Sequence, residues 1–277
     1  MLMNWKSPHG RELPSPEAMP LVMGVLNVGS GSFSDGGLYS GDAEALARAG
    51  EMAEQGADII DIGAESTRPG AQPVSLDEEL GILIPKLKSV RAHFPEMPIS
   101  VDTYKPEVAQ IAVEEGADII NDVYACRDAG GYPMARVAAH LGAPLVLTHS
   151  CRGEICLGNF MDFFLGGMES RLNEALGEGM QKDNIILDPG VGFGKTREQN
   201  FELVKNLPLM EEFGCAVLLG VSRKSLFNGV AGPSIEELDA ATCAVSAYCA
   251  YFKSAQILRV HNVAANIAAM KTILKLL

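Results

Sequence analysis

Eight short apolar runs constrain the fold of this 277-residue chain more than any other feature. The runs are rich in Val, Ile and Leu and span residues 21–28, 59–63, 99–102, 119–123, 145–149, 185–188, 216–222 and 257–261. Longer segments with helical periodicity follow them, near residues 43–55, 76–93, 106–115, 132–141, 161–181, 198–206, 236–253 and 262–275. Continuous apolar strands that alternate with helices are typical of parallel strands buried on both faces.

Eight such units predict a single-domain α/β fold, the TIM (β/α)8 barrel, which typically takes about 250 residues. The barrel is expected over residues 20–277. Residues 1–19 carry three prolines and are expected to form an N-terminal extension that edges or plugs the bottom of the barrel. An open doubly wound sheet is the alternative, but regular units without a break in composition favour closure.

Charge and composition narrow the class of partner. The net charge of −13 argues against a broad surface for nucleic acid or for an anionic membrane. No apolar run approaches the roughly 18 residues of a membrane helix, and the first 20 residues lack the apolar core of a signal peptide. Six scattered cysteines without a C-x-x-C pair are expected to be reduced thiols, as in a cytoplasmic protein.

Polar residues collect at the carboxyl end of nearly every predicted strand. They are Asn27, then Asp61, Glu65, Ser66, Thr67 and Arg68, then Asp102, Asn121, Asp122, His149 and Asp188, and finally Ser222, Arg223, Lys224, Arg259 and His261. In a barrel these ends converge on one mouth, where barrel enzymes keep their active sites.

The residue types indicate what this mouth binds. Asp102, Asn121 and Asp188 offer acceptors and an amide edge, which suit a flat heterocycle with several N–H groups. Cationic donors suit an oxyanion such as diphosphate, and the chain provides Lys195, Lys224, Arg68, Arg259 and His261. The expected ligand is a nitrogenous ring that carries an anionic group.

The stretch GVGFGKT at 190–196 looks like a phosphate-binding P-loop, but Pro189 stands where that motif needs its first glycine. An NTPase is therefore excluded. No Ser or Cys reads as an activated nucleophile, since Ser222 and Ser225 have no His partner evident in the sequence.

Seven motifs together resemble the dihydropteroate synthase family from Met23 onward. In chain order they are MGVLNV…SFSDGG, ESTRPG, SVDTYKPEVA, GADIIND, ILDPGVGFGKT, GVSRKS and RVH. The resemblance implies an enzyme of folate biosynthesis that condenses 6-hydroxymethyl-7,8-dihydropterin diphosphate with p-aminobenzoate, releasing diphosphate by dissociative substitution.

The resemblance also implies roles for individual residues. Asp102, Asn121, Asp188 and Lys224 would hold the pterin ring. Asn27 would ligate Mg²⁺ on the diphosphate, while Arg68, Arg259 and His261 bind its oxygens. The p-aminobenzoate site would be built from Phe33, Ser34, Asp35, Phe193, Lys195 and Ser225, with Asp35 stabilising the positive charge left on the pterin. Thr67 is expected to bind substrate as well.

Three positions depart from the family pattern. The first loop reads Gly29-Ser30-Gly31 where Thr-Pro-Asp is usual, Thr148 stands where Met is usual, and Asn262 follows His261 where Asp is common. Freeing the loop backbone at three positions would weaken loop closure by about 1–3 kcal/mol. We therefore expect weaker binding of p-aminobenzoate and of its sulfonamide mimics, with pterin binding retained.

Two other functions stay open on the sequence alone. One is a pterin-dependent methyltransferase, although a methyl donor has no diphosphate to hold. The other is a non-catalytic or weakly active pterin-binding relative, which the altered loop supports. The resemblance implies a homodimer, and the apolar segments 240–251 and 263–277 could form its interface or be buried within one chain.

Overall fold

A closed barrel of eight parallel strands forms the centre of the computed structural model, with neighbours paired in chain order. The structure describes residues 3, 5–29, 41–66, 71–124, 131–151, 156 and 158–277. The strands are β1 (Leu21–Asn27), β2 (Ile59–Gly63), β3 (Ile99–Asp102), β4 (Ile119–Asp122), β5 (Leu145–Thr148), β6 (Ile185–Asp188), β7 (Ala216–Leu219) and β8 (Ile257–Val260). The barrel closes because β8 pairs with β1, which confirms the predicted fold and excludes the alternative of an open doubly wound sheet.

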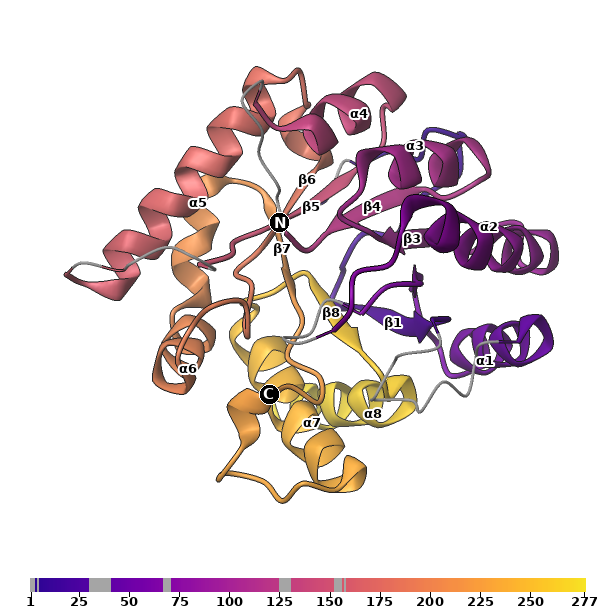
Figure 1. Ribbon diagram of the computed structural model, residues 1–277. Helices are drawn as coiled ribbons and strands as arrows, with labels where there is room; N and C mark the ends of the chain where they lie inside the picture. Colours follow the sequence, from indigo (N-terminus) through magenta and orange to yellow (C-terminus); the bar gives the residue numbers. More distant parts are fainter. Residues whose placement is uncertain are drawn as a thin grey trace.

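In the part of the chain that the structure describes, eight α-helices surround this barrel (Figure 1). They are α1 (Asp42–Glu54), α2 (Leu76–His93), α3 (Pro106–Glu114), α4 (Pro133–Leu141), α5 (Phe160–Gly177), α6 (Arg197–Lys205), α7 (Ile235–Phe252) and α8 (Val263–Leu274). Short 3₁₀ segments, η1 (Lys182–Asn184), η2 (Leu207–Phe213) and η3 (Ser225–Phe227), lie beside β6 and β7. No helix in the described ranges is long and apolar enough to cross a bilayer.

Two elements end three or more residues earlier than the apolar pattern predicts, and the turns that follow them explain both. The β7 strand was expected to reach residue 222, but a turn in which Lys224 N–H donates to the Val221 carbonyl follows it. The α5 helix was expected to reach residue 181. It stops at Gly177, because Gly179 takes a left-handed φ of 99° and Met180 N–H donates back to the Ala175 carbonyl.

The barrel interior changes character along its axis. Its lower layers are apolar and include Met23, Ile59, Val146, Ile186 and Leu218. Side chains alternate between the two faces of a strand, so the next inward positions lie two residues further along. Two residues beyond Ile59 and Ile186 stand the polar residues Asp61 and Asp188, and a row of partner residues at the carboxyl ends runs from Asn27 through Gly63 and Asp102 to Asn121. The alternation thus builds a polar floor at one end of an apolar core.

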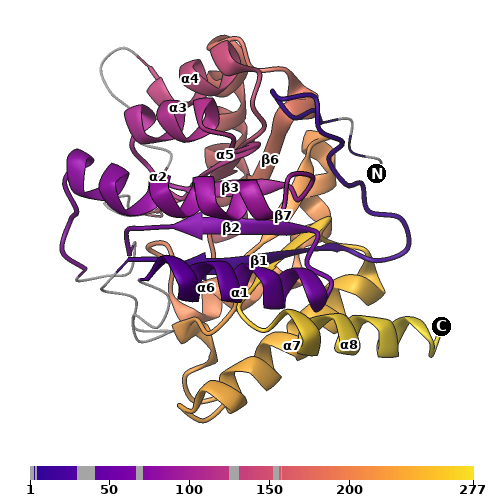
Figure 2. The same cartoon turned by 90° about the vertical axis from the view of Figure 1, so that its right-hand side faces the viewer.

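The segment before β1 closes the opposite end of the barrel (Figure 2). Trp5 and Met3 are buried and belong to the same apolar cluster as Leu21, Met23 and Ile257. The indole Nε1 of Trp5 donates to the Pro14 carbonyl at 2.7 Å, which folds the segment back on itself. The N-terminal segment therefore plugs the bottom of the barrel, as its prolines and position suggested.

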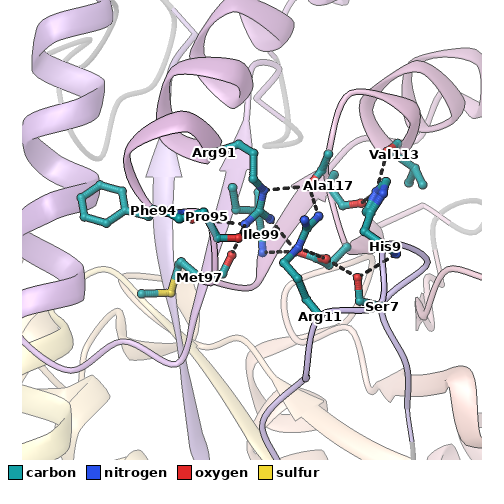
Figure 3. Close-up of polar contacts among 12 residues, drawn as sticks. Ser7, His9, Arg11, Arg91, Phe94, Pro95, Met97, Ile99, Val113 and Ala117 are labelled. Carbon is teal, nitrogen blue, oxygen red and sulfur yellow. Dashed lines mark hydrogen bonds and ion pairs between the residues drawn. The ribbon is translucent and has the colours of Figure 1, made fainter.

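One fully buried carboxylate, Asp118, ties this segment to the barrel (Figure 3). Its Oδ1 accepts from Ser7 Oγ at 2.5 Å and from Arg11 Nε at 2.9 Å. Its Oδ2 accepts from the Arg91 guanidinium at 2.6 Å and from the Ile99 N–H at 3.0 Å. Asp118 thereby joins the N-terminal segment, α2 and β3 at one point.

Candidate active site

A cavity of about 530 Å³ opens at the carboxyl ends of the strands. It is lined by residues from all the strand ends predicted to meet there except that of β5. The predicted residues that line it are Asn27, Glu65, Ser66, Asp102, Asn121, Asp188, Phe193, Ser222, Arg223, Lys224, Ser225, Arg259 and His261. The polar strand ends therefore share one cavity, as the barrel fold requires.

A charged network forms the floor of this cavity. The Arg259 guanidinium bridges two carboxylates, with Nε 2.6 Å from Asp61 Oδ2 and a terminal nitrogen 2.5 Å from Asp102 Oδ2. The Asn121 amide also donates to Asp61 Oδ2, at 3.1 Å. This donation uses the amide nitrogen, so Asn121 presents its oxygen as an acceptor. Within the described chain, the buried atoms Asp102 Oδ1 and Asn121 Oδ1 have no hydrogen-bond partner.

Burial controls the protonation of this floor. Loss of solvent raises the pKa of Asp102 to about 7, against the opposing charge of Arg259 and with the help of the negative charge on Asp61. Burial would lower the pKa of Arg259, but Asp61 and Asp102 hold it above its usual range, so the guanidinium stays charged. Burial also raises the pKa of Asp188, although Lys224 opposes the effect.

The loop after β6 forms one wall of the cavity. Asp188 Oδ1 accepts from the Gly190 N–H at 2.7 Å, which shapes the turn. Gly190 has a left-handed φ of 68°, and a Cβ there would lie 1.9 Å from the His149 carbonyl oxygen. This backbone demand explains the glycines that imitate a P-loop. Phe193 faces the cavity, and Lys224 Nζ lies 4.9 Å from its ring centre while donating to the Val191 carbonyl at 2.7 Å.

Ser222 and His261, which follow β7 and β8, form a hydrogen-bonded pair that also lines the cavity. His261 Nδ1 lies 2.9 Å from Ser222 Oγ, and the His261 backbone N–H donates to the same oxygen at 3.2 Å. The sequence shows no His partner for Ser222, and the structure supplies one, because β7 and β8 are neighbours in space although 39 residues separate the two side chains. Ser222 Oγ accepts from the backbone N–H and shares a further hydrogen bond with Nδ1, whose role as donor or acceptor depends on the imidazole tautomer. That arrangement orients the imidazole.

A group of ion pairs and hydrogen bonds joins the segments that follow β2 and β3 at the mouth of the cavity. Glu65 lines the cavity, pairs with Lys105 and accepts from the Tyr104 hydroxyl at 2.8 Å. Lys105 also reaches the buried Glu79, 2.5 Å away. Although burial opposes it, the hydrogen bonds from Lys105 and Tyr104 hold the pKa of Glu65 below its usual range. Sequence reasoning missed Tyr104, Lys105 and Glu79, since nothing in the chain pattern signals a pair 40 residues apart.

The cavity contains one predicted protein ligand for Mg²⁺, Asn27. Asn27 at the end of β1 lines the cavity and carries an amide oxygen. Among the residues the structure describes, no group of three or more His, Cys, Asp or Glu could hold a metal ion. Mg²⁺ takes one or two protein oxygens where substrate phosphates and water complete its shell. The donor set fits an ion bound together with diphosphate.

Some predicted site residues lie elsewhere. Lys195 does not line the cavity; its Nζ donates to the carbonyls of His149 and Gly190 at 2.8 and 2.9 Å. His149 is buried beside Phe164, with ring centres 4.9 Å apart, and Asp122 accepts from the Tyr132 hydroxyl at 2.7 Å. Five further predicted residues fall outside the described ranges: Phe33, Ser34, Asp35, Thr67 and Arg68.

Comparisons with known proteins point in one direction. The family model for pterin binding enzymes matches residues 23–261. A dihydropteroate synthase of Streptococcus pyogenes is 43% identical over 254 residues, which cover 90% of this chain and 93% of the relative.

Solved structures agree with the sequence relatives. The dihydropteroate synthase of Xanthomonas albilineans with 4-aminobenzoic acid matches with a TM-score of 0.87 and 37% identity, covering 98% of each chain. The Yersinia pestis dihydropteroate synthase in a sulfonamide drug complex matches with a TM-score of 0.85 and 33% identity, covering 95% of this chain and 96% of that one.

Proposed function

Because the chain belongs to the dihydropteroate synthase family of pterin-binding enzymes, we propose that its barrel mouth condenses 6-hydroxymethyl-7,8-dihydropterin diphosphate with p-aminobenzoate. The products are 7,8-dihydropteroate and diphosphate, so the chain acts as a transferase in folate biosynthesis. The methyltransferase alternative lacks support, since the relatives described above are synthases.

The pair of unpartnered acceptors on the cavity floor is the observation that carries the proposal. A buried polar atom without a partner is costly, and these two belong to residues that line the cavity, so they suit a ligand that donates to both. The pterin edge presents adjacent N–H groups. Asp102 Oδ1 and Asn121 Oδ1 accept from them, Asp188 accepts from a further N–H, and Lys224 donates to a ring acceptor.

The diphosphate lies toward the wall formed by His261. In the tautomer in which the Ser222 hydroxyl donates to Nδ1, the imidazole carries its proton on Nε2, which can then donate to an anion. Asn27 would hold Mg²⁺ by its amide oxygen, and the bound ion would supply charge neutralisation for the leaving group. The predicted diphosphate contacts of Arg259 and Arg68 stay predictions, since Arg259 is held by Asp61 and Asp102 in this structure.

The chemistry follows from these contacts. The C–O bond between the pterin methylene and the diphosphate breaks first, and the electron-rich pterin shares the positive charge left behind. The p-aminobenzoate amine then attacks the methylene carbon and loses a proton. Phe193 and Ser225 line the same cavity and would orient the aromatic ring of p-aminobenzoate, so proximity supplies much of the rate gain.

Assembly and location complete the proposal. We place the enzyme in the cytoplasm, which suits the five described cysteines because all of them are free thiols. We also propose a homodimer through α7, α8 and the residues that follow α8, where the exposed apolar residues Tyr251, Phe252, Leu276 and Leu277 suit a contact with a second copy.

Diphosphate release tests the proposal. The purified chain, mixed with pterin diphosphate, p-aminobenzoate and Mg²⁺, is expected to release one diphosphate for each dihydropteroate formed. Complementation of a folate-auxotrophic strain that lacks the synthase provides the cellular counterpart. Pterin binding without diphosphate release or complementation would support the non-catalytic relative instead.

A further inference from the structure

Arg223 adopts a backbone conformation that side chains other than glycine rarely take. Its φ is 55°, and it is the third residue of the turn that the Lys224 N–H closes onto the Val221 carbonyl. A positive φ at the third position of a tight turn favours glycine. Such strain persists only where the surroundings hold it. The turn carries Ser222 and Lys224, two residues that line the cavity.

The buried carboxylate of Asp239 on α7 holds this strained turn. Asp239 Oδ1 accepts from Arg223 Nε at 2.7 Å, and Oδ2 accepts from a terminal guanidinium nitrogen at 2.9 Å. This bidentate contact fixes both the distance between the two side chains and the plane of the guanidinium, which a single hydrogen bond does not. Thr242, also on α7, accepts from the Arg223 backbone N–H at 3.4 Å.

Asn262 connects the same carboxylate to the neighbouring strand. Its amide nitrogen donates to Asp239 Oδ2 at 3.0 Å, while its amide oxygen caps α8 by accepting from the Ala265 N–H at 3.1 Å. Asn262 directly follows His261. One carboxylate therefore holds the Lys224 turn and the residue next to His261 at once.

We infer that Asp239 is a positioning residue that couples Lys224 to His261, and that Asn262 is required because it donates to Asp239. The inference rests on the proposed function for the roles of Lys224 and His261. It gives the departure at Asn262 a physical reason, since an Asp there would set a second negative charge against Asp239. Neither residue is proposed to touch substrate.

The Asn262→Asp variant tests the inference because Asp caps a helix as well as Asn does. The α8 cap is kept, and only the donor to Asp239 is lost. We expect kcat/KM for pterin diphosphate to fall about tenfold, with KM for p-aminobenzoate within about twofold of wild type, as for coupled neighbours. Asp239→Asn is expected to lower the same parameter. In the Asp239→Asn background, Asn262→Asp should cost less than about twofold, because the repulsion is gone.

Two control variants make the same chemical changes away from the mouth. Asn206→Asp adds one negative charge at the end of α6, and Glu178→Gln removes the half-buried carboxylate that makes two hydrogen bonds to Arg136. Both should keep wild-type kinetics. Should Asn262→Asp not fold, Asn262→Ser keeps a capping oxygen without the added charge and should still lower kcat/KM for pterin diphosphate.

Three results would overturn the inference: wild-type kinetics in Asn262→Asp, an equal loss in the Asp239→Asn background, or a loss that raises both KM values together with a drop in the unfolding midpoint. The wild-type chain serves as reference in each assay. If it does not form dihydropteroate, the proposed function fails, whereas normal wild-type turnover with any of these results refutes the coupling alone.

Discussion

At the residue scale, the protonation of Asp102 links pH to pterin binding. Burial raises its pKa to about 7, so near that pH the native carboxyl still holds a proton that an ordinary carboxyl has lost. Its contribution to stability therefore falls as pH rises from its ordinary pKa of 3.8 toward 7. Ring N–H groups donate to the ionised form, so pterin affinity should rise about tenfold from about pH 6 to about pH 8. Calorimetric titration with 6-hydroxymethylpterin measures this, and proton release should appear as a buffer-dependent heat.

The Asp102→Asn variant is the control for that effect. It should bind pterin more weakly and with a smaller pH dependence, what remains coming from Asp188, whose pKa is raised in the same direction. An affinity that is flat across this range in the wild-type chain would contradict the assigned role of Asp102.

Gly29 shows at the same scale why one departure from the family pattern is tolerated. A Cβ at this position would lie 2.1 Å from the Ala64 carbonyl oxygen, so Gly29 lies directly against the backbone that follows β2. Gly29→Thr should therefore lower the free energy of unfolding by about 1–3 kcal/mol through overpacking. Gly81→Ala in α2, where nothing lies within 4 Å of the added methyl, should instead raise it by about 0.5–1 kcal/mol. Urea unfolding compares the two, and equal effects would remove the steric explanation.

At the scale of elements, Asp118 makes the N-terminal segment part of the barrel. Asp118→Asn leaves the partly buried Arg11 and Arg91 without their countercharge and should lower the free energy of unfolding by about 3–5 kcal/mol. Asp183→Asn, on the exposed η1 segment, should change it by less than about 0.5 kcal/mol. The measurement is urea unfolding followed by Trp5 fluorescence, which reports directly on the segment. A small loss in the free energy of unfolding for Asp118→Asn would mean that apolar packing alone holds the N-terminal segment on the barrel.

The elements themselves could be predicted because their apolar patterns are local. Each strand is a short run of Val, Ile and Leu, and helix starts carry caps such as Ser75 and Ser234. Strand ends were less accurate, since turns such as the one at Arg223 depend on a partner far along the chain. For the same reason the sequence did not reveal Asp239 or Lys105 as supports of the mouth.

At the scale of the whole molecule, closure of the barrel brings the polar strand ends together in one site. Knowing that eight parallel strands close was enough to bring Asp102, Asn121, Asp188 and Lys224 to one cavity. Closure alone did not specify side-chain direction. Lys195 follows β6, but its Nζ donates to the backbone carbonyl of His149 and not into the cavity. His149 follows β5, but its ring packs against Phe164 of α5.

The assembly of the whole molecule gives the last prediction. Tyr251 and Phe252 are 46% and 52% exposed at the end of α7, and their rings lie 4.8 Å apart. Two large aromatic side chains held together in solvent favour an apolar contact, so the wild-type chain should sediment as a dimer.

Phe252→Glu places a charge in that contact and should shift the chain toward monomer, by more than about tenfold in dissociation constant. Leu209→Glu, on the exposed η2 segment, adds the same charge outside the proposed interface and should leave the dimer intact. Sedimentation velocity at several concentrations separates these outcomes. A Phe252→Glu chain that stays dimeric would move the interface elsewhere, and a monomeric wild-type chain would remove it.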